Sequence, residues 1–297
     1  MNQFSISQLS QFSGIKAHTI RIWEQRYNAL EPNRSKGNTR YYDNSQLRRL
    51  LNIVSLTECD YKISEIGSLP DQELFELIKE LPDNSIVKKP IEYFVSQLLA
   101  AGVDYDEPHF EKIFSHCLLR FGMKETYMNV VYPMLVRIGL MWTSDTLAPA
   151  LEHFISNIIR QKLFTTIDSL PFPKSTSDTW LLFLPENEFH EIGLLFAHYL
   201  VRLSGRKSIY LGSNVPLHSL TAVIENTLPK NLLLFLVHHD SPVITQEYLS
   251  ELNNSFTGKN IYVAGNNNLM GQIKTSKRVH WLQSVKNLEE QFQDKNV

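Results

Sequence analysis

The stretch Thr19-Ile20-Arg21-Ile22-Trp23-Glu24-Gln25-Arg26-Tyr27 decides the fold of the amino-terminal region. Ile20, Trp23 and Tyr27 recur at helical spacing and form one apolar face, which predicts a helix over residues 17–27. Upstream, Ser5 with Gln8 three residues later is a capping-box signature for a first helix. Ser13-Gly14 marks a turn between the two segments, and two helices joined by a short Gly-containing turn predict a helix-turn-helix.

A basic, turn-rich ribbon follows the second helix, Arg34-Ser35-Lys36-Gly37-Asn38-Thr39-Arg40-Tyr41-Tyr42. A further apolar helix is expected after Asp43-Asn44-Ser45, so that residues 1–80 form a winged helix-turn-helix. The second helix and the ribbon carry side chains suited to base edges and phosphates. We predict DNA contacts from Lys16, His18, Thr19, Arg21, Arg34, Lys36, Arg40 and Tyr41.

The charge distribution also favours a head that binds a polyanion. Residues 1–49 hold eight Lys/Arg and three Asp/Glu, whereas the whole chain holds 29 Lys/Arg and 31 Asp/Glu. A basic head on an acidic body indicates a nucleic-acid-binding module joined to something else.

Composition excludes several classes of protein. With 43% hydrophobic residues the chain is too apolar for disorder, and no apolar run reaches the roughly 18 residues of a membrane helix. The amino terminus lacks a signal-peptide pattern, and Cys59 and Cys117 lie far apart. We therefore expect a cytoplasmic protein with no membrane partner and no disulfide scaffold.

The rest of the chain divides into two further regions. Residues 91–170 show four apolar-periodic segments, with Pro108, Pro133 and Pro149 at expected helix starts, and predict a four-helix bundle. Residues 178–297 alternate short apolar runs with helical stretches, which predicts a five-stranded parallel sheet of the flavodoxin-like, Rossmann-like type. Ligands of such folds sit at the carboxyl ends of the strands.

The head resembles the winged helix of MerR-family regulators. The resemblance rests on residues 19–27, on Pro32-Asn33-Arg34 and on Asn38-Thr39-Arg40-Tyr41-Tyr42, and Trp23 before Glu24 resembles the branch that carries cobalamin-binding domains. It implies a palindromic double-stranded DNA operator as partner, self-association as a dimer or tetramer, and RNA polymerase as a further partner.

Three motifs follow one another in the remainder. Trp142 is followed after nine residues by Glu152-His153; Glu188, His190 and Gly193 follow the first expected strand; and Tyr210 to Pro216 follow the second. In this order they resemble the cobalamin-binding module of methionine synthase and of CarH/LitR-type regulators. The resemblance implies adenosylcobalamin or methylcobalamin as cofactor.

The same resemblance assigns roles to individual residues. His190 would be the lower axial ligand of cobalt, since a neutral imidazole is a good cobalt ligand, and Glu188 would fix its tautomer. Gly193 and Gly265 would lie close to the corrin or its nucleotide tail. Trp142, Glu152 and His153 would cover the upper face.

Three positions depart from the family pattern. The end of the third strand has Leu236 without the usual hydroxyl residue, Ala264 replaces the first glycine of a Gly-Gly pair, and Thr143 stands where light-sensing members carry a His. The sequence thus predicts a regulator of the MerR family in which cobalamin controls oligomerisation and operator binding. The alternative is a regulator that has lost the cofactor and responds to a protein partner or another small molecule. An enzymatic corrinoid carrier is disfavoured because such a carrier has no use for a basic winged helix.

Overall fold

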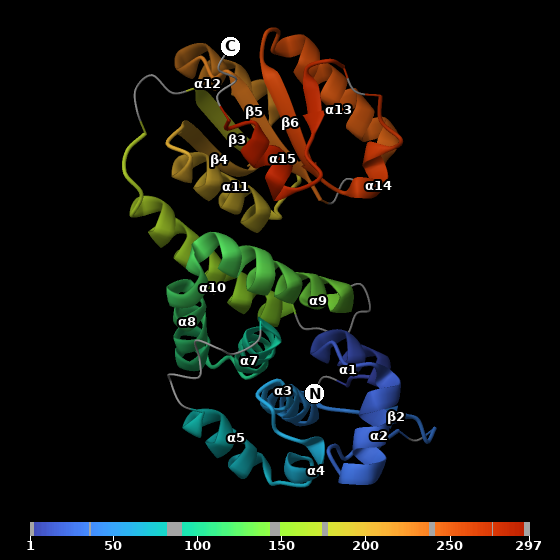
Figure 1. Cartoon of the computed structure of the whole chain (residues 1–297). Coiled ribbons are helices and arrows are strands. Elements are labelled where there is room, and N and C mark those ends of the chain that lie inside the picture. Colours follow the sequence, from blue (N-terminus) through green and yellow to red (C-terminus); the bar gives the residue numbers. More distant parts are fainter. Residues whose placement is uncertain are drawn as a thin grey trace. The chain divides into compact units, whose positions relative to one another are not determined.

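The computed structural model describes residues 3–35, 37–81, 91–142, 149–173, 178–237, 241–274 and 276–293. The chain forms two compact units, Met1–Asn157 and Ile158–Val297 (Figure 1). Linkers are expected at 82–90 and 171–177, of which residues 82–90 and 174–177 lie outside the described residues. The expected three-domain boundaries stay a prediction. In the described ranges no helix has the length and apolar character needed to cross a bilayer.

The first unit is helical apart from one small hairpin. In chain order its elements are α1 (Ile6–Ser13), α2 (Ala17–Tyr27), β1 (Asn33–Arg34), β2 (Arg40–Tyr41), α3 (Asn44–Thr57), α4 (Ile63–Ile66), α5 (Asp71–Glu80), α7 (Ile91–Val103), α8 (Glu107–Thr126), the π-helical turn η1 (Tyr127–Val131) and α9 (Tyr132–Trp142). The helix α10 (Pro149–Asp168) spans the border between the two units.

The head has the predicted helix-turn-helix with a wing. Ser5 and Gln8 form the expected capping box at the start of α1, and Gly14 ends this helix with a φ of 72°, which a glycine adopts without strain. β1 and β2 pair antiparallel as the wing. The backbone of Phe4 pairs with that of Tyr42, so the start of the chain is bound to the end of the wing.

The head shares a packed interface with the helices that follow it. Helix α3 of the head packs against α7. The amide of Gln97 in α7 donates to Asn52 Oδ1 at 3.2 Å and to Ser55 Oγ at 2.8 Å, both on α3. On its other side, Oε1 of Gln97 lies 3.0 Å from Nε2 of His109 in α8. Because Asn52, Ser55 and Gln97 are buried and bonded to one another, they fix the register between head and bundle.

The expected start of a helix at Pro133 is confirmed to within one residue, because α9 begins at Tyr132 and Pro133 lies in its first turn. A further break lies at Gly122 within α8, whose φ of 73° and ψ of 170° are not helical, and helical structure then continues through η1 into α9. In a regular helix the ring of Pro133 would clash with the carbonyl of residue 129. The π-helical turn just before Pro133 changes this spacing, as such insertions do in interrupted helices.

The second unit is a doubly wound α/β domain. Its strands are β3 (Thr179–Pro185), β4 (Lys207–Val215), β5 (Asn231–Leu236), β6 (Asn260–Gly265) and β7 (Val279–Trp281). They pair in parallel in the order β4-β3-β5-β6-β7. This is the flavodoxin-like strand order, as predicted from the apolar runs.

Helices cover both faces of this sheet (Figure 1). On one face, α12 (Leu220–Thr227), α13 (Pro242–Ser255) and α14 (Asn267–Met270) contribute to a core with the strands. On the other, α11 (Glu191–Leu203) packs on β3, β4 and β5. A last helix, α15 (Val285–Glu290), leads to Phe292, which stacks edge-on against Trp180 of β3.

Candidate ligand-binding and nucleic-acid-binding sites

Glu188 is the central residue of the loop between β3 and α11. Its side chain is fully buried. Its Oε1 accepts hydrogen bonds from the backbone N–H groups of Phe189 at 2.9 Å and His190 at 3.0 Å. Its Oε2 accepts from the N–H of Val237, just after β5, at 2.9 Å. A buried carboxylate is stable here because fixed N–H donors replace water around it.

These bonds lie at the point where the strand order reverses. The chain leaves β3 for β4 on one side and later returns to β5 on the other. Loops after β3 and β5 therefore diverge at the carboxyl edge of the sheet, where doubly wound folds bind ligands. Glu188 ties the two loops together at this point.

His190 stands at the amino end of α11 with its ring fixed by Glu188. Its Nδ1 lies 2.7 Å from Oε1 of Glu188, and its side chain is 37% exposed. A carboxylate at Nδ1 holds the proton there, so coordination of a metal by this ring falls to Nε2. A partly exposed imidazole with a buried carboxylate behind it is suited to bind a transition-metal ion such as cobalt.

Two glycines beside this loop accept close backbone or side-chain contacts. A Cβ on Gly193 would lie 2.9 Å from a ring carbon of Phe235, the neighbour of Leu236 on β5. A Cβ on Gly265 would lie 2.0 Å from the carbonyl oxygen of Leu236, and Gly265 has a φ of +136°. Gly265 is thus required by the packing of β6 on β5, and Gly193 by the ring of Phe235.

Three residues to which the sequence gave no role hold α11 against β4. Tyr210 of β4 donates to Oε1 of Glu191 at 2.7 Å, and the ring of His198 stacks on that of Tyr210 with centroids 4.9 Å apart. Burial, together with the bond to Glu191, raises the pKa of Tyr210. Tyr210 belongs to the motif of residues 210–216 that was expected after the second strand, but β4 extends to Val215, so nearly all of this motif lies within the strand. Glu191 and His198 gave no signal in the sequence.

The motif of the helical region lies on α9 and α10. Trp142 is the last residue of α9, and its side chain lies outside what the structure describes. Glu152 and His153 follow in the first turn of α10, with Nδ1 of His153 2.7 Å from Oε2 of Glu152. Ser156 donates to the other oxygen of Glu152. The Glu-His pair is therefore preformed, and His153 is the exposed member.

Helix α2, the candidate recognition helix of the helix-turn-helix, presents a polar face to solvent. Lys16 at its amino end, His18 and Arg21 are exposed, and Thr19 is half-buried. Gln25 is also exposed and stands four residues after Arg21, so it shares this face. Gln25 is a candidate base contact that the sequence reasoning missed, although its helical spacing could have indicated it.

The wing is bound to the recognition helix through Glu24. Tyr42 donates to the buried carboxylate of Glu24 at 2.6 Å, and burial and this bond raise the pKa of Tyr42. Nε of Arg40 lies 3.5 Å from the same carboxylate. Arg34 is exposed and donates to Asn38 within the wing. Tyr41 is half-buried, and Lys36 lies outside the described residues.

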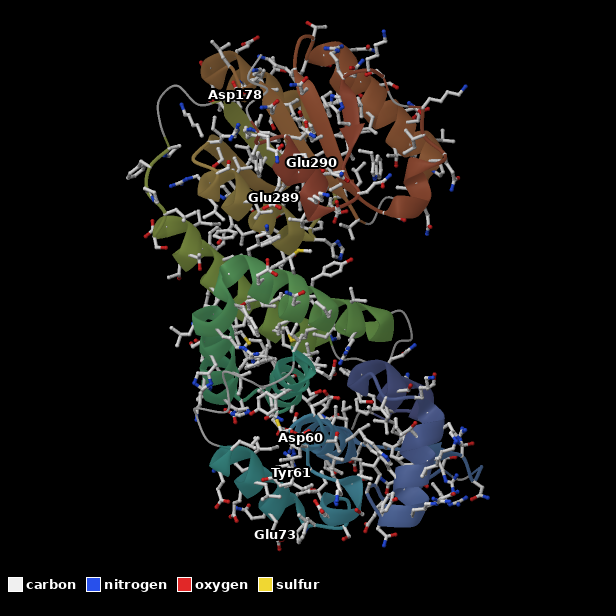
Figure 2. All side chains as sticks on the ribbon, viewed as in Figure 1. Asp60, Tyr61, Glu73, Asp178, Glu289 and Glu290 are labelled. Carbon is white, nitrogen blue, oxygen red and sulfur yellow. The ribbon has the colours of Figure 1, made fainter. Side chains whose placement is uncertain are left out.

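Several acidic residues lie away from these sites. Asp178, labelled in Figure 2, precedes β3 and forms an ion pair with Lys230, which precedes β5. Both are at the amino end of the sheet, whereas Glu188 and His190 follow β3 at its carboxyl end.

Comparison with known proteins agrees with this architecture. Residues 4–73 match the family described as MerR HTH family regulatory protein, and residues 95–165 match the B12 binding domain family. The HTH-type transcriptional repressor CarH of Myxococcus xanthus is 27% identical over 88% of this chain and 88% of its own length. The HTH-type transcriptional repressor CarA of the same organism is 25% identical over 83% of this chain and 80% of its own.

A solved structure gives the same fold. The monomethylamine corrinoid protein of Methanosarcina barkeri aligns with a TM-score of 0.51 at 11% identity, over 68% of this chain and 97% of its own. The chain is therefore a MerR-type helix-turn-helix protein that carries a B12-binding domain and is a homologue of the CarH and CarA repressors.

Proposed function

We propose that the chain is a transcriptional repressor without enzymatic activity, whose affinity for its operator is controlled by a cobalamin bound through His190. The observation that carries this proposal is the Glu188–His190 pair at the switch point of the sheet, with Nδ1 2.7 Å from the carboxylate. Its two relatives are both named transcriptional repressors, which supports the sign of regulation.

The residues present fit a corrinoid. A bound cobalamin would supply a cobalt ion, for which a neutral imidazole nitrogen is a suitable ligand. We assign His190 as the cobalt ligand and Glu188 as the residue that holds the proton on Nδ1 of His190. We also assign Gly193 and Gly265 to the proposed cobalamin site. Trp142, Glu152 and His153, which form the motif of the helical region, are further proposed contacts with the cofactor.

The proposed DNA partner is a palindromic operator read by two heads. Lys16, His18, Arg21 and the half-buried Thr19 would meet the major groove, and Arg34, Lys36, Arg40 and Tyr41 of the wing would meet the backbone. Two linked heads bind far more tightly than one because the second binding step is intramolecular. Cobalamin would act by favouring the oligomer in which two heads reach the DNA together.

Absorption spectroscopy tests the ligand assignment. The protein is incubated with adenosylcobalamin in the dark, desalted and scanned, beside the variants His190→Ala and His218→Ala; His218 is an exposed histidine of the same unit. We expect wild type and His218→Ala to retain one and the same cobalamin spectrum, and His190→Ala to lose or alter it. A colourless wild-type protein would remove cobalamin from the proposal.

Sedimentation and operator binding test the rest. We expect added cobalamin to raise the oligomeric state of wild type and its operator affinity together, and to do neither in His190→Ala. Without cobalamin, the affinity of His190→Ala for the operator should equal that of wild type, because His190 lies outside the DNA-binding head. An oligomeric state that is the same with and without bound cobalamin would contradict the mechanism.

A second candidate is a regulator that answers to a protein partner. It is favoured by Phe235, since a Cβ on Gly193 would lie 2.9 Å from a ring carbon of Phe235, so that the space beside this glycine is filled by the protein's own side chain and not by a cofactor. The desalting experiment separates the two candidates, because only the first requires a retained chromophore.

A further inference from the structure

The side chain of Arg137 in α9 reaches the turn of the helix-turn-helix. Its Nη1 donates to the carbonyl oxygen of Phe12, in the last turn of α1, at 3.2 Å. A Cβ on Gly14, the residue that ends α1, would lie 3.2 Å from Nη2 of the same guanidinium. The turn between α1 and α2 therefore rests directly on a residue of the helical bundle.

Glu92 of α7 holds the guanidinium in place. Its two carboxylate oxygens accept from Nη1 and Nη2 of Arg137, each at 2.7 Å, and the Arg137 side chain is only 17% exposed. Ser96, one turn further along α7, donates to Oε1 of Glu92. A two-pronged Arg–carboxylate pair with little exposure fixes direction as well as distance.

The contact with Phe12 has a clear physical role. The last carbonyl groups of a helix have no partner within the helix, and the helix dipole makes this end attractive to cations. Arg137 supplies both the donor and the positive charge. Helix α1 is thus capped by a residue that lies 125 positions away in the chain.

We propose that Arg137 is a positioning residue of the DNA-binding head, which holds the turn and so lets α9 set the position of the recognition helix α2. Helix α9 ends at Trp142, five residues beyond Arg137, or about 7.5 Å along a helix. As far as ligand control is concerned, this inference rests on the proposed function: a ligand that moves the Trp142 end of α9 would act on the operator through Arg137.

The test compares two contacts between head and bundle. Arg137→Gln and Arg137→Lys alter the proposed contact; the lysine variant keeps the charge but not the two-pronged geometry. Asp104→Asn is the matched control, because Asp104 pairs with Arg48 of α3 at 2.8 Å, away from the turn. Hydrogen exchange of residues 13–17 and operator affinity at several salt concentrations are measured on the ligand-free full chain.

We expect Arg137→Gln to speed amide exchange in the turn and to weaken operator binding about tenfold, which corresponds to about 1.4 kcal/mol. The dependence of affinity on salt should stay unchanged, because Arg137 is not a phosphate contact. Arg137→Lys should fall between Arg137→Gln and wild type, and Asp104→Asn should match wild type. Unchanged exchange and affinity in Arg137→Gln, or an equal loss in Asp104→Asn, would overturn the proposal.

Repeating the binding with cobalamin separates this inference from the proposed function. If wild type binds DNA equally well with and without cobalamin while Arg137→Gln loosens the turn, the ligand control fails and the positioning role stands. If wild type responds to cobalamin and Arg137→Gln responds to the same degree with an unaltered turn, the positioning role fails.

Discussion

The carboxylate of Glu188, just after β3, accepts a hydrogen bond from the backbone N–H of Val237, just after β5, at 2.9 Å. The same side chain holds Nδ1 of His190 at 2.7 Å. One buried residue therefore both joins the two loops at the switch point of the sheet and orients the candidate cobalt ligand. The position of His190 depends on the sheet itself rather than on its own loop alone.

Replacing Glu188 by Gln tests this double role. The amide has one oxygen and one NH₂ group, so it cannot accept on both sides, and a backbone N–H loses its buried partner. We expect the free energy of unfolding to fall by about 2 kcal/mol and cobalamin affinity to fall 10–100-fold. Urea unfolding and equilibrium titration measure the two effects.

The control for this variant is Glu186→Gln, since Glu186 is an exposed acid of the same loop. It should leave both quantities within error of wild type. A Glu188→Gln protein as stable as the control, with wild-type cobalamin affinity, would show that the carboxylate does not organise the site.

Gly265 gives a second prediction about the same edge of the sheet. A Cβ there would lie 2.0 Å from the carbonyl oxygen of Leu236, at a φ of +136°. Gly265→Ala should therefore cost at least about 3 kcal/mol of stability or prevent folding. The matched control is Gly258→Ala, at a φ of +78° with nothing within 4 Å, which should cost about 1–2 kcal/mol. Thermal unfolding of the two variants measures both losses of stability, and equal losses would contradict the steric argument.

Local spacing carried much of the fold and part of the site. The capping box at Ser5, the extent of α2 and the five parallel strands all follow from patterns within a few residues. The Glu188–His190 contact was also predictable, because the two residues are two positions apart at a strand-to-helix turn.

Contacts between distant segments could not be predicted in this way. Val237 lies 49 positions from Glu188, and Phe12 lies 125 positions from Arg137. Such pairs depend on how elements pack, which periodicity does not encode. The start of α9 near Pro133 was predictable because proline is common in the first turn of a helix, whereas nothing in the spacing indicated the π-helical turn that leads into it.

The wing offers a third prediction, on the salt dependence of DNA binding. Arg34 is bonded to the neutral amide of Asn38, whereas Arg40 lies 3.5 Å from the carboxylate of Glu24. Arg34→Ala should lower the slope of log affinity against log salt by about one. Arg40→Ala should lower it by less, because part of its charge is already balanced within the protein.

Fluorescence anisotropy with labelled operator at several salt concentrations measures both slopes. Lys230→Ala, a basic residue of the α/β unit paired with Asp178, should leave the slope unchanged. Slopes that do not move in either wing variant would remove the wing from the DNA interface.

The fourth prediction concerns acid stability and His198. Burial, followed by the nearby charge of Arg202, lowers the pKa of His198 from 6.5 to about 4, and its Nδ1 has no hydrogen-bond partner within the described part of the chain. As the pH falls, the unfolded chain takes up this proton before the folded one does. The stabilising contribution is therefore fully present above pH 6.5 and is lost between pH 6.5 and 4.

Partial exposure of the ring limits this loss to about 2 kcal/mol. His198→Phe removes the titration but keeps an aromatic ring against Tyr210, where the native rings stack at 12°. Urea unfolding at pH 7.5 and 4.5 should show a smaller acid loss in His198→Phe than in wild type. Some loss should remain, because burial also lowers the pKa of His109 in the network between head and bundle. An identical loss in both proteins would mean that the folded chain does not lower the pKa of His198, and this would contradict the burial of its ring against Tyr210.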